Sequence, residues 1–499
     1  MKKITCVFIV LLTGHLLFAQ GDVALKYGNL ITPSDLKDNL SIIASDALEG
    51  RKTGTRGQKM AAAFISNHFD ELGLGAPVNG SHYQVVELYS SAPGETYVKL
   101  GESKYTNFNE VVYFGAADTG GETALDVVFA GKGTEADFAN LNVKDKAVLV
   151  LQDALSFNAL SAVRKINELA RGKGAKMLLL VFASTTDQFK QFAGQLKPYL
   201  ADGSFSLEKP NTDNKGAFLI DQSVAEKILN STYEKLSKVS GDAKAIAKVK
   251  PGKFTYKVVM NSKIVKSENI LGYLEGTDKK DELIIVSAHF DHIGVEAEGE
   301  DKINNGADDD GSGTVSVLQM AKAFAQAKKE GHGPRRSILF MTVTGEEEGL
   351  FGSEYYVTHP VFPLAQTVAD LNIDMVGRRD PEHKGKADYV YVIGSDKLSS
   401  ELHAINESNN KKYTQLEYDY TYNDENHPTN LYKRSDHWNF AKNNIPIVFY
   451  FDGIHEDYHR VSDEVGKIEF DLLAKRAKNV FFTAWELANR DGRIVVDKK

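Results

Sequence analysis

Cysteine is nearly absent from this chain: the only one among 499 residues is Cys6, in an apolar segment at the N-terminus. The rest of the chain therefore has no thiol for a disulfide, a metal site or nucleophilic attack. Runs rich in lysine and arginine are also missing, and the formal net charge is -9 at pH 7. These absences exclude a disulfide framework and argue against nucleic acid as a partner.

Residues 1–20 combine a basic start, an apolar stretch and the small residue Ala19. This pattern is typical of a secretory signal peptide, cut here near Ala19 or Gln20. A retained membrane anchor is the alternative, but the apolar run is shorter than a bilayer span. We therefore expect an exported protein, periplasmic or extracellular, with no stable membrane span in the mature chain.

The composition that remains, 42% hydrophobic and 25% charged, is ordinary for a soluble globular protein with two or three domains. Thr32 and Pro33 predict a helix start, and a second helix is expected over about 58–72. Residues 95–250 carry short strands and polar stretches, whereas strand–helix alternation is strong beyond them. We predict an α/β fold: a doubly wound, mostly parallel sheet with helices on both faces over 21–94 and 251–499. A smaller, β-rich α/β domain is inserted at 95–250.

Several short apolar runs in the second half of the chain lead to an acidic residue or a histidine. Such runs predict buried parallel strands, and ligands of open α/β sheets bind outside the carboxyl ends of the strands. Two imidazoles and three carboxylates gathered there suit a pair of zinc ions, one carboxylate bridging them. The candidate ligands are His289, Asp309, Glu347, Asp374 and His459.

Each motif also has a plainer interpretation. In S-A-H-F-D-H, Asp291 could accept the second ring N–H of His289, and His292 is left out of the site. The D-D-D-G run is either a solvated acidic loop or a metal site, since adjacent aspartates repel unless neutralised; its spacing does not fit a calcium loop. In G-E-E-E, Glu346 and Glu347 cannot face the same way, so one can bind metal while the other takes a proton. The alternative there is a charged helix start.

Asp374 lies in the apolar run N-I-D-M-V-G, where an aspartate is costly to bury unless it is paired or bound to metal. Residues 455–459 read H-E-D-Y-H, the zinc-binding pattern of helical metalloproteases. That chemistry requires an amphipathic helix, which the surrounding residues do not predict. We therefore interpret His459 alone as a ligand, and His455 and Glu456 as ordinary loop residues.

These five ordered motifs together resemble the co-catalytic di-zinc exopeptidases of metallopeptidase family twenty-eight, as does the N-terminal A-S-D-A-L-E-G-R-K-T-G-T-R-G. The resemblance covers about 27–92 and 255–492 and implies the zinc exopeptidase fold. It also implies that Asp309 bridges two Zn²⁺ and precedes a cis peptide bond. The remaining implied roles are His289 and Asp374 on one zinc, Glu347 and His459 on the other, Glu346 as general base and Asp291 as partner of His289.

Residues 95–250 resemble, more weakly, an inserted protease-associated domain. Gly311 is a mild departure from the family, which often has alanine at that position. The segment Lys433–Trp438 is a candidate wall of the substrate pocket; alternatively, Ser435 caps a helix.

The resemblance implies an exported, zinc-dependent exopeptidase acting on peptides, with an aminopeptidase favoured. A carboxypeptidase or dipeptidase of the same family, a glutaminyl cyclase and a non-catalytic, receptor-like protein are the alternatives. The sequence leaves open the preferred side chain, the oligomeric state and the choice between amino- and carboxypeptidase.

Overall fold

In the computed structural model, the chain folds into two units. The structure describes residues 23–498, except 154, 156, 202 and 211–215. The first unit comprises the described residues up to Glu87 and those from Lys266 onward; the second is Leu88–Val265. The predicted signal peptide and Cys6 lie outside the described residues. Among the described residues, no helix has the length and apolar character needed to cross a bilayer.

The sheet of the first unit has β10 (Lys279–His289) at its centre, between β13 (Arg336–Val343) and β14 (Thr367–Ile373). Both neighbours pair with β10 in parallel, and β17 (Ile447–Phe451) pairs in parallel with β14. Beyond β17 follow β15 (Tyr389–Ile393), antiparallel to it, and β16 (Glu417–Asp419). The end of β9 (Gly252–Leu274) pairs antiparallel with β13. The sheet is therefore mostly parallel; β13, β14 and β17 are buried along their whole length, and β10 is buried from Leu283 onward.

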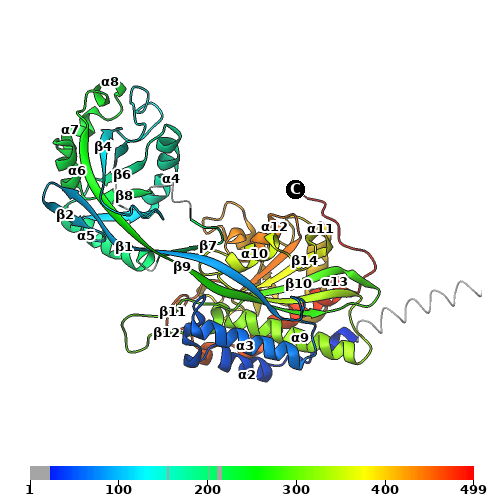
Figure 1. The fold of residues 1–499 in the computed structure, drawn as a ribbon. Helices are drawn as coiled ribbons and strands as arrows, with labels where there is room; N and C mark the ends of the chain where they lie inside the picture. Colours follow the sequence, from blue (N-terminus) through cyan, green and yellow to red (C-terminus); the bar gives the residue numbers. More distant parts are fainter. Residues whose placement is uncertain (1–22, 154, 156, 202, 211–215, 499) are drawn as a thin grey trace, which may run out of the picture. The chain divides into compact units, whose positions relative to one another are not determined.

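Helices cover both faces of this sheet because successive side chains of a strand point to opposite faces. Ile284, Val286 and Ala288 of β10 share one core with α2 (Pro33–Ile43), α3 (Arg56–Glu71), α9 (Gly313–Lys329) and α13 (Phe470–Asn489). Leu283 and Ile285 pack on the other side with α10 (Phe351–Thr358) and α12 (His437–Ala441). Figure 1 shows α2, α3 and α9 on one side of the strands and α10 and α12 on the other. The predicted doubly wound, mostly parallel sheet is confirmed.

The ends of these elements follow the local sequence. The Thr32 hydroxyl accepts the N–H of Asp35 and caps α2, with Pro33 in the first turn, as predicted. The remaining elements of the first unit are α11 (Ser400–Asn409), the short strands β11 (Gly294–Val295) and β12 (Ile303–Asn304), and several single helical turns.

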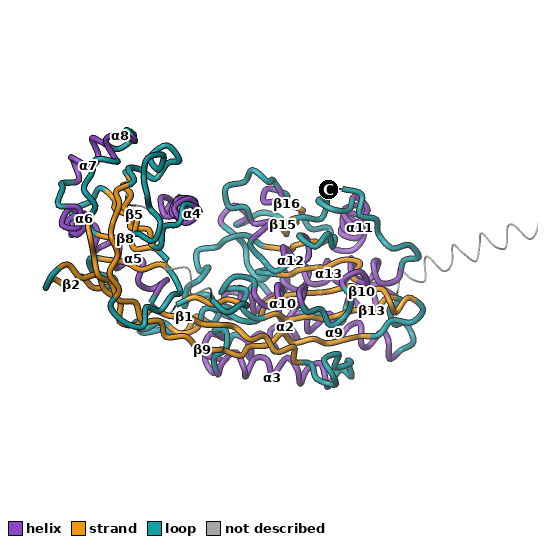
Figure 2. The backbone as a smooth tube through the Cα atoms, turned by 45° about the horizontal axis from the view of Figure 1, so that its top comes forward, coloured by secondary structure: helices purple, strands orange, loops and turns teal. Residues whose placement is uncertain are grey.

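The second unit has a smaller sheet with its own cores. Its parallel strands are β4 (Thr123–Phe129), β5 (Ala147–Gln152), β6 (Met177–Phe182) and β8 (Ala217–Ile220). The start of β9 and β3 (Val111–Phe114) flank them antiparallel, and β1 (Tyr83–Leu100) pairs with β2 (Ser103–Thr106) and β7 (Ser204–Ser206). In Figure 2 these strands run between helices. One face carries α4 (Phe157–Gly172) and α5 (Thr186–Leu200), and the other α6 (Gln222–Leu229), α7 (Tyr233–Val239) and α8 (Ala243–Ile246).

Candidate metal centre

All five predicted ligands meet at the carboxyl ends of the parallel strands in the first unit. His289 is the last residue of β10, and Asp374 follows the last residue of β14. Glu347 lies just beyond β13, and His459 lies in the segment after β17. Asp309 comes from an irregular turn, Ala307–Ser312, immediately before α9, and its peptide bond to Asp310 is cis, as the resemblance implied. Segments far apart in sequence therefore deliver their side chains to one place.

The two carboxylate oxygens of Asp309 face two different imidazoles. Oδ1 lies 3.3 Å from Nε2 of His289, which is also 3.5 Å from Oδ1 of Asp374. Oδ2 lies 3.1 Å from Nε2 of His459, which is also 3.0 Å from Oε2 of Glu347. Two clusters of donors thus share one carboxylate, the arrangement that a bridging ligand between two cations requires.

The donor set fits divalent cations that bind nitrogen and oxygen, such as zinc. Oδ2 of Asp309 is buried and makes no hydrogen bond within the described residues, although Nε2 of His459 is close. A buried carboxylate oxygen without a hydrogen bond is costly unless a cation supplies its partner. The orphaned oxygen and the converging nitrogens therefore fit metal ions at both positions.

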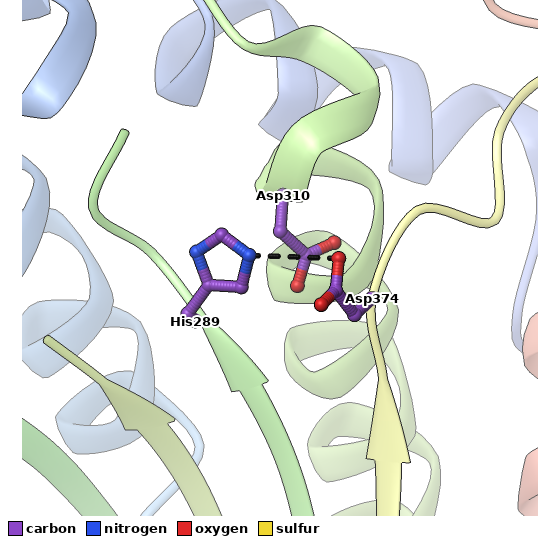
Figure 3. Close-up of side chains that lie close together, drawn as sticks. All are labelled: His289, Asp310 and Asp374. Carbon is purple, nitrogen blue, oxygen red and sulfur yellow. Dashed lines mark ion pairs between the residues drawn. The ribbon is translucent and has the colours of Figure 1, made fainter. Parts of the chain in front are cut away.

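Asp310 joins the first cluster, although the sequence did not single it out. Figure 3 shows Asp310 beside His289 and Asp374, and ligand atoms of the three lie within 4.8 Å of one another. Oδ1 of Asp310 accepts the N–H groups of Gly313 at 2.8 Å and Met375 at 3.1 Å, while Oδ2 is buried without a partner among the described residues. Asp310 thus ties the start of α9 to the end of β14, and burial raises the pKa of its carboxyl group well above the usual value.

The adjacent residues Glu346 and Glu347 have opposite electrostatic environments. Burial raises the pKa of Glu346 well above its usual value, and the charges of Asp374 and Glu347 act in the same direction. Burial and the charge of Asp309 also act to raise the pKa of Glu347, but hydrogen bonds from His292 and His459 outweigh them and lower it. Burial lowers the pKa of His459, yet the adjacent carboxylates of Asp309 and Glu347 raise it to about 10.

Asp291 makes a different contact from the one we expected. Nδ1 of His289 lies 3.1 Å from the backbone oxygen of Asp291 and 3.9 Å from its carboxylate. The carboxylate instead accepts the hydroxyl of Thr53 at 2.8 Å and the backbone N–H of Glu346 at 3.2 Å. Asp291 therefore holds the loop that carries Glu346, while its backbone orients His289.

The N-terminal segment contributes a second buried anchor, which sequence reasoning did not find. The guanidinium of Arg51 donates to the carbonyl groups of Phe290, Ile43, Asn305 and Gly306 at 2.6–2.9 Å. Three of these carbonyls belong to the segments that follow His289 and precede Asp309, and that of Ile43 lies at the end of α2. The motif E-G-R-K-T-G-T-R-G thus supports the centre from outside the strands that carry the ligands.

A cavity adjoins the centre. One side of it is polar, and the other side is mostly apolar apart from Arg434. His289, Asp309, Glu346 and Asp374 line the polar side. The remaining wall consists of Met375, Leu431, Arg434, Phe449, Phe451, Ile454 and Tyr458. Of the segment Lys433–Trp438, only Arg434 lines this cavity. Ser435 does not cap the following helix; its hydroxyl donates to Oδ2 of Asp374 at 2.6 Å and accepts from Asn372 at 3.0 Å.

The H-E-D-Y-H segment is a turn and not a helix, so its two histidines do not share a face. His459 lies beside Asp309 and Glu347, whereas Nε2 of His455 lies 3.1 Å from Oδ2 of Asp308. Glu456 is exposed and pairs with Lys384 at 2.9 Å. The helical metalloprotease arrangement is absent from these residues. His455 is nevertheless a buried partner of Asp308, which corrects our expectation of an ordinary loop residue.

Residues 269–484, somewhat less than half of the chain, match the model of peptidase family M28. The chain is 25% identical over 263 residues to a probable zinc metalloprotease of Pyricularia oryzae, covering 45% of this chain and 50% of that protein. It is 30% identical over 218 residues to a probable leucine aminopeptidase of Trichophyton verrucosum, covering 42% and 55% respectively. The chain therefore spans about half the length of these curated relatives.

A solved structure extends the likeness in fold to nearly the whole chain. The aminopeptidase from Aneurinibacillus sp. strain AM-1 superposes with a TM-score of 0.59, covering 95% of this chain and 98% of that one. Sequence identity in this comparison is 19%, so the likeness concerns the fold.

Proposed function

We propose that this chain is a zinc-dependent exopeptidase that removes N-terminal residues from peptides. The observation that carries the proposal is the carboxylate of Asp309, whose two oxygens face different histidines beside a cavity lined by Glu346. The family of residues 269–484 and the zinc metalloprotease among the relatives support it.

In this proposal, His289 and Asp374 would hold one zinc ion, Glu347 and His459 would hold the other, and Asp309 would serve both. When bound, two such ions supply Lewis acidity for the scissile carbonyl group and acidify the attacking water. The ligand carboxylates are oriented by the chain itself: Ser435 holds one oxygen of Asp374, so that the other faces His289. Fixed outer partners of this kind keep ligands in place for the metal.

Glu346 is the general base. It lines the cavity beside His289 and Asp374, and burial raises its pKa, which makes it a better proton acceptor than an exposed glutamate. Its carboxylate takes a proton from the attacking water and later passes it to the leaving amine. Asp291 positions Glu346 by accepting its backbone N–H, and Thr53 holds Asp291 in turn.

The walls of the cavity favour a substrate with an apolar side chain next to a positively charged terminus. Phe449, Phe451 and Ile454 provide an apolar surface, and the carboxylate of Glu346 beside it can accept a hydrogen bond from a terminal amine. A carboxypeptidase or dipeptidase is the second candidate. Arg434 favours it, because this exposed guanidinium at the cavity could pair with a substrate carboxylate.

A panel of substrates distinguishes these activities. The purified chain should hold close to two zinc ions, lose activity with a chelator and hydrolyse leucyl and phenylalanyl arylamides. Peptides with a blocked N-terminus should resist. Cleavage of N-blocked dipeptides would favour the second candidate, and cyclisation of N-terminal glutamine without hydrolysis would indicate a glutaminyl cyclase. One tightly held metal with full activity would contradict the two-zinc centre.

We also propose that residues 1–20 direct export and that residues 95–250 form a protease-associated domain. The basic start and apolar stretch support the first, and the hydrophobic cores of the second unit are compatible with the second. Fractionation of the producing cells and sequencing of the mature N-terminus test the export signal. An uncleaved N-terminus in a membrane fraction would contradict it.

A further inference from the structure

His292 lies three residues beyond the end of β10 and belongs to none of the five predicted ligands. Its side chain is completely buried. Its backbone N–H donates to the carbonyl group of Arg51 at 3.3 Å. Gly306 packs against the ring so closely that a Cβ atom at this position would lie 2.6 Å from ring carbons. The imidazole is therefore held in one place by its backbone and by a neighbour without a side chain.

The contacts of the ring identify which nitrogen carries a proton. Nδ1 lies 2.8 Å from Oε1 of Glu347, whereas Nε2 is buried without a hydrogen-bond partner among the described residues. A carboxylate can only accept a hydrogen bond, so Nδ1 must be the donor. The two oxygens of Glu347 thus face different imidazoles: Oε1 accepts from His292, and Oε2 lies 3.0 Å from His459.

Ligand atoms of His292, Asp309 and Glu347 lie within 4.8 Å of one another, so His292 is itself within reach of a metal, but its distances differ from those of His459. Nε2 of His459 is almost equidistant from Asp309 and Glu347, at 3.1 and 3.0 Å, as expected for donors that surround one cation. Nδ1 of His292 is 3.9 Å from Asp309 and 2.8 Å from Glu347. A ring nitrogen that donates its proton to a carboxylate has no lone pair to offer a metal.

We propose that His292 is a positioning residue for Glu347. By holding Oε1, it turns Oε2 toward the second metal position between Asp309 and His459 and keeps the carboxylate from rotating. This inference rests on the proposed two-zinc function, because it assigns Glu347 to that position. Loss of such an outer partner typically lowers metal affinity by about 10–100-fold.

Two substitutions separate the hydrogen bond from the ring itself. His292→Asn places an amide N–H near the position of Nδ1 but removes the ring, whereas His292→Phe keeps a ring and removes the donor. Titration of the metal-free proteins with zinc gives the affinity of each position, and circular dichroism of the same samples reports folding. Ser435→Ala is the matched control, because it removes the equivalent donor to Asp374 at the first position.

His292→Phe should weaken the second zinc by about 10–100-fold and leave the first unchanged. His292→Asn should stay within several-fold of the parent, and Ser435→Ala should weaken only the first zinc. Unchanged second-zinc affinity in His292→Phe would overturn the inference, as would equal losses in both His292 variants. If His292→Phe does not fold, His292→Ala, which also removes the donor, takes its place in the comparison with His292→Asn. A parent chain that binds only one zinc would instead contradict the proposed function.

Discussion

At the scale of single residues, the centre depends on neighbours in sequence that have different surroundings. Glu347 shares its carboxylate between His292 and His459, whereas Glu346 faces the cavity. Asp308, Asp309 and Asp310 are likewise separated by their partners: His455, the two facing histidines and the start of α9. A run of acidic residues thus becomes a set of distinct roles, because each side chain meets different donors.

Substitution of each glutamate should separate proton transfer from metal binding. Glu346→Gln keeps the volume of the side chain and should retain both metals, but it should lower turnover by roughly 10²–10⁴-fold because the general base is lost. Glu347→Gln should lower the zinc content itself. Zinc analysis and hydrolysis rates of the two variants check this. Normal turnover by Glu346→Gln would show that another group accepts the proton.

The two histidines of the H-E-D-Y-H segment should affect different properties: His459 zinc binding and activity, and His455 the stability of the fold. His459→Ala should remove one zinc and nearly all activity. His455→Ala should lower the free energy of unfolding by about 3–5 kcal/mol, because it leaves Asp308 buried without its partner, yet activity per folded molecule should stay within several-fold of the parent. Glu456→Gln breaks a surface ion pair and should lower the free energy of unfolding by at most about 1 kcal/mol. Zinc content, urea unfolding and hydrolysis rates separate the three outcomes. A dead Glu456→Gln beside an active Asp309→Ala would reverse the assignment of ligands.

At the scale of elements, the sequence predicts the strands whose ends carry the site residues. It does not predict the residues that hold those side chains in place through hydrogen bonds. β10, β13, β14 and β17 are apolar runs, and each leads to a predicted site residue, so periodicity and topology suffice to bring these residues together. Thr53, Arg51 and Ser435 reach the centre through hydrogen bonds with residues more than 60 positions away. Such contacts leave no local pattern in the sequence. The role of His292 was missed for the same reason, since its partner Glu347 lies on a different strand end.

A buried acid inside β14 should make stability depend on pH. Burial raises the pKa of Asp370 to about 8, although a hydrogen bond from Ser287 acts against it. The folded chain then keeps a proton that the unfolded chain has lost, so this residue lowers stability as the pH rises from about 4 to 8. Asp370→Asn removes this proton but keeps an acceptor for Ser287. Its free energy of unfolding should therefore fall less steeply, by about 1.4 kcal/mol per pH unit. Urea unfolding at several pH values measures both slopes; parallel slopes would show that Asp370 does not titrate in this range.

At the scale of the whole molecule, one unit carries the complete centre. All five predicted ligands, the proposed base and their supports belong to the residues up to Glu87 and from Lys266 onward. The change of character in the sequence indicated an insertion at 95–250, whereas the compact units divide near 88 and 265. Both divisions fall within the long strands β1 and β9, where a continuous extended chain offers no change of composition to mark them.

Removal of metal should therefore destabilise one unit only. Each unit has its own hydrophobic core, and a ligand stabilises the part of the chain that binds it, by about 4 kcal/mol at a concentration 1,000 times its dissociation constant. Calorimetry should show two unfolding transitions. A chelator should lower the temperature of one by several degrees and leave the other unchanged. In Asp309→Ala, which lacks the shared carboxylate, the transition that depends on metal should stay at its metal-free temperature whether or not zinc is added. A shift of both transitions by the same amount would mean that the units unfold together or that metal binds outside this centre.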